Sequence, residues 1–310
     1  MPDIIFSIVF PLVLLAFLII IFVSGFSKTV PEQQFMSLDE FIKDWLKDHG
    51  QAHKLDEQFA KMKKDPSGAF YMPITYKGAK LFIKWGLSAN KVSFINLIMS
   101  FFIFYGVIMA SDGHNLGLLF TVQPLYGSWF ILLALLVLFT GIIDGIDGAI
   151  ARLLNKKSKS GAWLDNVIDR VSDILMLVCL IPYGFSGLLN LELNFIFICF
   201  VWTNIFIIFI YEYMRARHEG LGLHETKPYP GERITRVLVT TTFFLIYGIS
   251  SFVVLLTILI NPSTITFWTI SHSFVVTWIM LIFQITLFVI MTSSSILLGK
   301  YSFQQLKKMD

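Results

Sequence analysis

Apolar residues occur along this chain in long blocks, without the strict alternation of a strand or the one-sided stripe of a soluble helix. A helix needs about 20 apolar residues to cross the hydrocarbon core of a bilayer. Blocks of this kind occupy seven ranges: 4–26, 92–110, 129–143, 174–185, 195–211, 237–260 and 274–298. The pattern predicts an all-α integral membrane protein with seven transmembrane helices, in contact with the lipid bilayer.

Composition supports a membrane protein. Of the 310 residues 55% are hydrophobic and 15% are charged, whereas a soluble domain carries roughly 25% charged residues. The net charge of +3 is too small to indicate a nucleic-acid partner. Cys179 and Cys199 lie inside apolar runs and match no zinc or disulfide spacing, so we interpret them as packing residues. A homodimer is compatible with these features, which do not fix the oligomeric state.

Basic residues predict the orientation. All 24 Lys and Arg residues fall in the ranges 27–91, 144–173, 212–236 and 299–310. Basic loops face the cytoplasm, so seven crossings place the N-terminus outside and the C-terminus inside. The first block has no positive charge before it and is interpreted as an uncleaved anchor over 1–26. A cleaved leader that ends near Ser24 is the alternative.

The segment 27–75 is predicted to be a cytosolic helical insert. Ser37 followed by Glu40 is typical of a capping box at the start of a helix. The range 76–88 mixes lysines with large apolar residues and predicts a helix in the headgroup layer. The membrane domain then covers 76–300, and 301–310 form a cytosolic tail.

Five aspartates lie between the third and fourth blocks. The spacing of Asp144 and Asp147 places them on one helical face, and the spacing of Asp165, Asp169 and Asp173 places these three on one face of the next helix. Their mutual repulsion near lipid requires compensating cations, and Arg152 and Arg170 are too few. Carboxylate ligands suit Mg²⁺ or Mn²⁺, and facing carboxylates suit two ions that assist phosphoryl chemistry.

Small residues accompany the carboxylates. Gly145, Gly148, Ala151 and Gly161 leave room for a phosphate or a base to approach the backbone, and Arg152 suits phosphate oxygens. A different class of function, a divalent-cation transporter, would use the same carboxylates to line an ion pathway. Metal flux into proteoliposomes in the absence of nucleotide would distinguish such a transporter from an enzyme. The sequence disfavours it because no second acidic cluster continues a path across the membrane.

The stretch from Asp144 to Asp169 reads Asp-x2-Asp-Gly-x2-Ala-Arg-x8-Gly-x3-Asp-x3-Asp. It resembles, without a substitution, the signature of the CDP-alcohol phosphotransferase family. The stretch 86–93 is also similar to a family motif, with Ala89 in place of proline. The resemblance covers about 76–300 and implies a six-helix core, so that the first crossing is an additional helix. It implies transfer of a phosphatidyl or archaetidyl group from CDP-diacylglycerol or CDP-archaeol to a polar alcohol, with release of CMP.

The resemblance also implies roles for individual residues. Asp169 would act as the catalytic base on the acceptor hydroxyl. The metal ligands would be Asp144, Asp147, Asp165 and Asp169. The CDP moiety would contact Asp144, Gly148, Ala151, Arg152 and Gly161. The active site would then lie on the cytoplasmic side of the membrane.

A second cytosolic loop bears on the acceptor. Four cationic residues flank or lie in this loop: Arg215, Arg217, Arg233 and Arg236. They are explained by positive-inside bias or by contact with lipid headgroups, or they bind a phosphorylated acceptor. The loop resembles the phosphatidylinositol-phosphate and archaetidylinositol-phosphate synthase branch. That resemblance implies that Arg215 and Arg236 hold the phosphate of myo-inositol 3-phosphate. Glu212, His218 and Thr235 depart from the branch pattern, and glycerol 3-phosphate, serine and free inositol stay open as acceptors.

Overall fold

The computed structural model describes residues 5–26, 35–48, 51, 54–65, 67–112, 123–180, 191–223 and 229–309. Within these ranges all regular secondary structure is helical, which confirms the all-α fold class. The elements are η1 (Ile5–Val9), α2 (Phe10–Phe26), α3 (Leu38–Asp48), α4 (Leu55–Met62), η3 (Ser67–Tyr71), α5 (Met72–Lys84), α6 (Ala89–Asp112), α7 (Gln123–Ser128), α8 (Phe130–Leu153), α9 (Lys159–Val178), α10 (Leu191–Gly220), α11 (Arg233–Ile260), η5 (Pro262–Thr264) and α12 (Ile265–Leu306).

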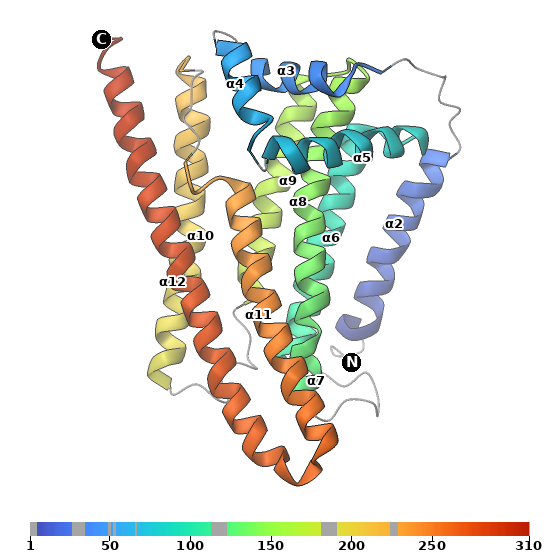
Figure 1. Ribbon diagram of the computed structural model, residues 1–310, viewed down its shortest axis with the longest axis vertical. Helices are drawn as coiled ribbons and strands as arrows, with labels where there is room; N and C mark the ends of the chain where they lie inside the picture. Colours follow the sequence, from blue (N-terminus) through green and yellow to red (C-terminus); the bar gives the residue numbers. More distant parts are fainter. Residues whose placement is uncertain are drawn as a thin grey trace.

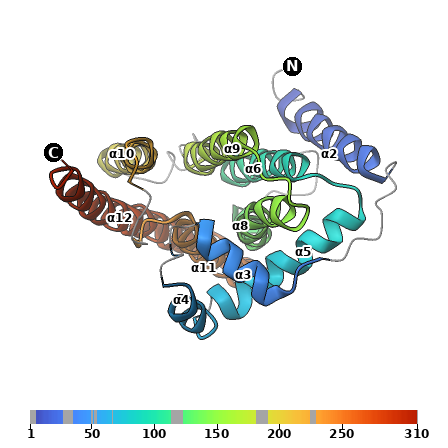
Figure 2. The same ribbon diagram turned by 90° about the horizontal axis from the view of Figure 1, so that it is seen from above.

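The long helices form a bundle of membrane length. Six stretches of the described residues are long and apolar enough to cross a bilayer, and they contain α2, α6, α8, α10, α11 and α12. The chain is therefore a multi-pass membrane protein. The predicted fourth crossing corresponds to α9, which lies beside α6 (Figure 2) but has a polar first half. Residues 181–185 of that predicted crossing lie outside the described residues, and seven crossings stay a prediction.

Several helices extend beyond the apolar blocks that predict them. The last crossing is α12, which continues through Leu306 into the range expected as a tail. The interfacial helix expected at 76–88 is α5, which begins at Met72 and ends at Lys84. Pro73 in the first turn suits this earlier start, because an N-terminal proline sacrifices no helical hydrogen bond. Apolar patterning marks the lipid-crossing part of a helix, whereas capping and polar residues decide where it ends.

The helices pack in a fixed order around two apolar cores. Helix α8 contacts α6 and α11, α11 contacts α12, and α10 lies beside α12. Figure 2 shows this arrangement from above, with α2 at one edge and α12 at the other. The larger core includes Phe130 of α8 and Phe244 of α11, whose ring centroids are 5.0 Å apart. These contacts fix α8 and α11 relative to each other, and α9 is held against α6.

The additional first helix is attached at both ends to α6. The Tyr105 hydroxyl donates to the Ser7 carbonyl at 2.8 Å, and Lys91 Nζ donates to the Ser24 carbonyl at 3.0 Å. Gly86 adopts a φ of 71° and packs directly on the backbone of Gly25. Any side chain at Gly86 would be strained and would collide there. The rest of α2 is apolar and exposed, as expected for a helix in lipid.

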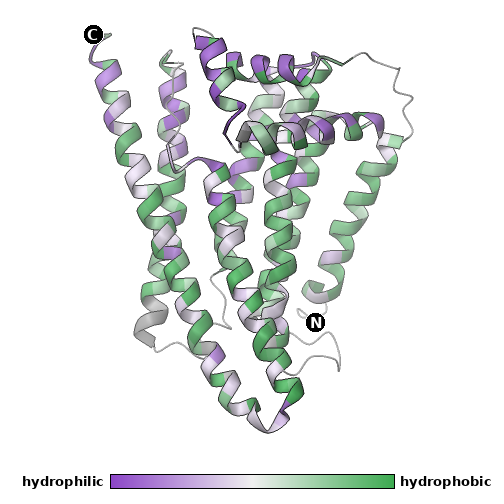
Figure 3. Cartoon of the chain, in the orientation of Figure 1, coloured by the Kyte–Doolittle hydropathy of each residue, from purple (hydrophilic) through white to green (hydrophobic). Residues whose placement is uncertain are grey.

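Hydrophilic residues gather at one end of the bundle (Figure 3). Helices α3, α4 and α5 lie across this polar end (Figure 1). The predicted capping box of α3 is present, since the Ser37 amide donates to Glu40 Oε2 at 2.7 Å and the Glu40 amide donates to Ser37 Oγ at 3.3 Å. In the sequence, Gly50 is a typical signal for the end of this helix, and it lies outside the described residues.

Candidate metal and substrate site

Three of the predicted metal ligands converge at the polar end of the bundle. One carboxylate oxygen from each of Asp144, Asp165 and Asp169 lies within 4.8 Å of the others. The connection from α8 to α9 allows this meeting. Asn155 turns the chain with a φ of 51°, and Ser158 caps α9 by accepting from the Gly161 amide at 3.0 Å. The two carboxylate faces that the sequence predicts therefore meet.

The fourth predicted ligand, Asp147, is held by a partner that sequence reasoning missed. Its side chain is buried, and Asp147 Oδ2 accepts a hydrogen bond from Ser93 Oγ at 2.6 Å. Ser93 lies on α6, in the stretch that resembles a family motif. The resemblance of that stretch to a family motif was the sequence signal that pointed to Ser93. The contact itself joins residues 54 positions apart and depends on how α6 packs against α8.

Arg233 lies among the aspartates and is the main correction to the sequence analysis. Its Nη1 forms ion pairs with Asp144 Oδ1 and Asp169 Oδ1, and its Nε lies 4.0 Å from Asp173 Oδ1. The sequence analysis considered only Arg152 and Arg170 as compensating cations and missed Arg233. Arg233 precedes Arg236 by three positions at the start of α11, so both face the same neighbours.

Asp173 joins a second charged group next to the aspartate cluster. Arg236 Nη2 lies 2.8 Å from Asp173 Oδ2 and 3.0 Å from Glu212 Oε1. Arg170 Nη1 lies 3.2 Å from Asp173 Oδ2 and 2.9 Å from Glu212 Oε1. Asp173 is thus an ion-pair partner that links α9 to α11. The family resemblance implies no role for Asp173, and the sequence suggests a helix–helix hydrogen bond; Arg236 Nη2 of α11 donates one to Asp173 Oδ2 at 2.8 Å.

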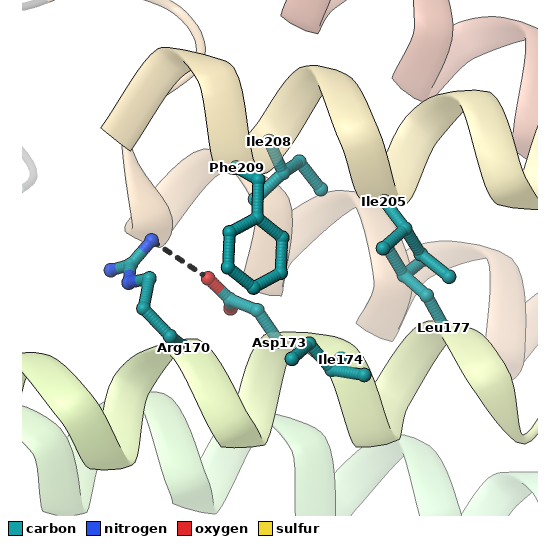
Figure 4. A pocket seen from close by; sticks show the side chains of 7 residues that line it. All are labelled: Arg170, Asp173, Ile174, Leu177, Ile205, Ile208 and Phe209. Atoms are coloured by element: carbon teal, nitrogen blue, oxygen red, sulfur yellow. Dashed lines mark ion pairs between the residues drawn. The ribbon is translucent and has the colours of Figure 1, made fainter. Parts of the chain in front are cut away.

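The charged group closes the polar end of a crevice between α9 and α10. Figure 4 shows Arg170 paired with Asp173 at this end. The remaining lining is apolar and consists of Ile174, Leu177, Ile205, Ile208 and Phe209. The crevice therefore has an ionic end and an apolar wall, but its volume of about 10 Å³ leaves room for about one water molecule.

The two arginines expected to hold an acceptor phosphate are occupied by carboxylates. Arg215 Nη1 lies 2.7 Å from Glu232 Oε2, and the Tyr211 hydroxyl donates to Glu232 Oε1 at 3.3 Å. Arg236 is almost fully buried and pairs with Asp173 and Glu212. The structure thus brings both arginines to the rim of the cluster, each with a glutamate partner.

Arg152 points to the insert and is held there. Its Nε lies 3.2 Å from Asp48 Oδ2 and 3.9 Å from Asp44 Oδ2 of α3. Burial alone would raise the pKa of Asp48, but the Lys157 hydrogen bond and the Arg152 charge lower it overall. Lys157 shows the converse, since its hydrogen bonds to Asp44 and Asp48 outweigh burial and raise its pKa.

The small residues of the motif differ in what they face. A Cβ on Gly148 would meet only Arg152 Nη1, at 3.1 Å, so this side of α8 stays open for a ligand. A Cβ on Gly145 would collide with the Tyr71 hydroxyl. The expected ligand space at Gly145 is therefore filled by a phenol, whose pKa is raised by burial and by the charge of Asp144.

Charge and geometry fit a divalent metal. Seven carboxylates gather here: Asp144, Asp147, Asp165, Asp169, Asp173, Glu212 and Glu232. Four arginines face them: Arg170, Arg215, Arg233 and Arg236. Asp165 Oδ1 is buried and, among the described residues, accepts no hydrogen bond. An oxygen-rich cluster with surplus negative charge is a site for Mg²⁺ or Mn²⁺.

Comparison with known proteins agrees with this chemistry. The family model for CDP-alcohol phosphatidyltransferase matches residues 87–288. The chain belongs to this family. The matched CDP-alcohol phosphatidyltransferase region contains all the predicted site residues and excludes α2, α3, α4 and α5.

Several curated proteins are similar to this chain over part of their length. Archaetidylinositol phosphate synthase of Methanothermobacter thermautotrophicus is 32% identical over 106 residues, which cover 34% of this chain and 49% of that protein. An uncharacterized protein of Aquifex aeolicus is 38% identical over 101 residues, with 32% and 48% coverage. Bifunctional IPC transferase and DIPP synthase of Aquifex aeolicus is 27% identical over 134 residues, with 41% and 30% coverage. The chain spans about half the length or less of these relatives.

Solved structures of phosphatidylinositol phosphate synthase from Mycobacterium tuberculosis also resemble this chain. The one with CDP-DAG bound has a TM-score of 0.43 at 18% identity and covers 71% of this chain and 94% of that one. A second, in complex with manganese and citrate, has a TM-score of 0.43 at 19% identity, with 69% and 88% coverage.

Proposed function

We propose that this protein is a phospholipid-biosynthetic transferase. It moves a phosphatidyl or archaetidyl group from a CDP-linked lipid to a polar alcohol and releases CMP. The observation that carries the proposal is the convergence of Asp144, Asp165 and Asp169 at the polar end of an apolar bundle. Family membership supports the reaction type. It gives no support to the cation-transporter hypothesis.

The proposed chemistry uses the aspartates in two ways. Asp144, Asp147, Asp165 and Asp169 hold two divalent ions, Mg²⁺ or Mn²⁺. Such ions, when bound, neutralise a diphosphate and stabilise the departing CMP. Asp169 accepts the proton of the acceptor hydroxyl, whose oxygen forms a bond to the lipid-side phosphorus while the bond from that phosphorus to CMP breaks.

The donor is proposed to lie along α8 and the start of α9. Asp144, Gly148, Ala151, Arg152 and Gly161 contact its CDP moiety. The open side of Gly148 supports this placement, because a phosphate can approach the backbone there. The lipid tails remain in the bilayer. CMP and the acceptor are proposed to exchange with the cytoplasm, and the basic residues of the polar end support this orientation because basic loops face the cytoplasm.

The acceptor is proposed to be myo-inositol 3-phosphate, with Arg215 and Arg236 on its phosphate. Two observations support a phosphorylated acceptor. Arg170 and Arg236 already share two anionic partners, Asp173 and Glu212, and a phosphate dianion can replace the carboxylate of Glu212. A relative named archaetidylinositol phosphate synthase supports the inositol phosphate. Glycerol 3-phosphate, serine and free inositol are the alternatives.

Release of CMP tests the reaction. Purified protein is incubated with CDP-diacylglycerol or CDP-archaeol, Mg²⁺ and each acceptor separately. We expect CMP with inositol 3-phosphate, loss of it on addition of EDTA, and recovery with excess Mg²⁺ or Mn²⁺. If no acceptor yields CMP while another family member is active in parallel, the proposed function is wrong. CMP with a different acceptor keeps the reaction and changes the acceptor.

Glu212→Gln tests the acceptor charge. If the acceptor phosphate replaces Glu212, removal of the competing charge lowers the KM for inositol 3-phosphate by about 3-fold or more. The control is Glu219→Gln, which removes an exposed carboxylate 3.8 Å from Arg215 Nε and leaves that KM unchanged. An unchanged or higher KM in Glu212→Gln contradicts a phosphate in this position.

A further inference from the structure

Helix α3 is attached rigidly to the polar end of the bundle. Phe41, Ile42 and Leu46 are no more than 2% exposed and belong to one apolar core with Ile150 and Leu153 of α8. Figure 1 shows α3 at the polar end of the bundle, where it contacts α5 and α8, and Figure 2 shows it beside α5 and over α11. The helix lies outside the family-matched residues, so its role is a property of this chain.

The acidic side of α3 faces the connection between α8 and α9. Asp48 contacts both Arg152 and Lys157, at 3.2 and 2.9 Å. Asp44 Oδ2 lies 2.6 Å from Lys157 Nζ but is farther from Arg152 Nε, at 3.9 Å. The carboxylate closer to Arg152 is therefore that of Asp48. Residues 104 positions apart meet here, because the apolar face of α3 is buried against α5 and α8.

The geometry of Arg152 leaves part of its guanidinium available. Asp48 accepts from Nε, while Nη1 lies 3.1 Å from the position that a Cβ on Gly148 would occupy. A guanidinium carries five N–H donors in a planar fork. One edge therefore faces α3, and an Nη group lies over the open side of Gly148, one helical turn from the metal-binding aspartates.

We propose that Asp48 is a positioning residue for the nucleotide donor. It holds Arg152 by Nε so that the Nη groups face the diphosphate of the CDP-lipid. The inference rests on the proposed function, because it gives α3 a part in binding the donor of that reaction. Without Asp48 the long side chain of Arg152 would sample several rotamers, and fewer of them would face the diphosphate.

Asp48→Asn tests this role through donor binding. We expect the KM for CDP-diacylglycerol to rise about 5-fold with kcat changed less than about 2-fold. Asp48→Glu restores part of the affinity. The matched control is Asp56→Asn on α4, whose carboxylate is exposed and pairs with Lys43 at 3.4 Å. That variant keeps the wild-type KM. A lower KM in Asp48→Asn would show that α3 obstructs the donor, which contradicts positioning.

A double-mutant cycle separates positioning from a structural role. If Asp48 acts through Arg152, Asp48→Asn has no further effect on KM in an Arg152→Gln background. Additive losses in the double variant contradict the inference. Calorimetric titration of the same four proteins with CDP and Mn²⁺ provides a second measurement. We expect the dissociation constants for CDP to show the same non-additivity as the KM values. If wild type binds CDP but releases no CMP with any acceptor, the proposed function fails while the cycle in CDP affinity still tests Asp48.

Discussion

At the scale of single residues, the site is an interleaved set of carboxylates and arginines. Arg233 contacts Asp144 and Asp169, and Arg236 contacts Asp173 and Glu212. A buried charge without a partner is costly, and removal of one member of a buried pair destabilises a protein by about 3–5 kcal/mol. Asp144 and Asp169 therefore neutralise Arg233 and are also the proposed metal ligands, so their substitutions must be assessed by stability as well as by activity.

The variant Asp169→Asn separates the contribution of this carboxylate to activity from its contribution to stability. Asparagine keeps the shape of the side chain but cannot accept the acceptor proton, so we expect CMP release to fall by at least about 100-fold. Binding of the CDP-lipid is expected to change far less, because the other aspartates remain. Activity, donor binding and the thermal unfolding midpoint are measured on the same preparation. Turnover close to wild type in a folded variant contradicts the role of Asp169 as base.

At the scale of elements, polar contacts between helices fix the bundle where apolar packing alone is weak. Asn204 of α10 donates to Gln284 Oε1 of α12 at 2.8 Å, and both side chains are fully buried. His272 of α12 contacts Ser251 Oγ of α11 at 2.8 Å. In lipid, hydrophobicity does not drive one helix toward another, so packing and such hydrogen bonds decide the pairing.

Gln284→Leu tests the contact between α10 and α12. The variant removes Gln284 Oε1, one of two acceptors of the Asn204 amide, and leaves the Gln284 backbone carbonyl, which accepts from Asn204 Nδ2 at 3.0 Å. We expect a loss of about 1 kcal/mol in the free energy of unfolding. The double variant Asn204→Leu/Gln284→Leu is expected to recover most of this loss, since no polar group is left unpaired. Denaturant titration in mixed micelles measures both. Equal stability of wild type and Gln284→Leu contradicts the contact.

At the scale of the whole molecule, the protein divides into an apolar body and one polar end. All 24 basic residues lie in segments that the sequence assigns to one side of the membrane, and Figure 3 shows the hydrophilic helices gathered at one end. The aspartates lie at that end, and η5 lies at the other (Figure 1). The insert adds α3 and α4 to the same polar end, where α3 contacts the motif helix α8.

Labelling of single cysteines tests the orientation. In a background with Cys179→Ala and Cys199→Ala, Lys64→Cys marks the polar end and Ser263→Cys marks η5. We expect a membrane-impermeant maleimide to label Ser263→Cys in intact cells and Lys64→Cys only after permeabilisation, because basic loops face the cytoplasm. The opposite pattern contradicts the N-out, C-in topology and the cytoplasmic active site.

The sequence by itself determined the features that depend on local spacing. Hydropathy along the chain predicts the membrane helices, and the spacing of the aspartates places each set on one helical face, because the helical period is fixed by backbone geometry. The signature from Asp144 to Asp169 predicts the family for the same reason: its residues lie within two consecutive helices. The capping box at Ser37 is likewise a local pattern.

Only the tertiary structure decided which charges meet. Arg233 contacts Asp144 across 89 residues, Ser93 contacts Asp147 across 54, and Arg152 contacts Asp48 across 104. Such contacts depend on how α11, α6 and α3 pack against α8, and helix packing follows from side-chain shape over the whole bundle. The sequence could therefore predict an acidic, metal-binding cluster, whereas the packing decided that an arginine lies within it and that an inserted helix holds the Arg152 side chain.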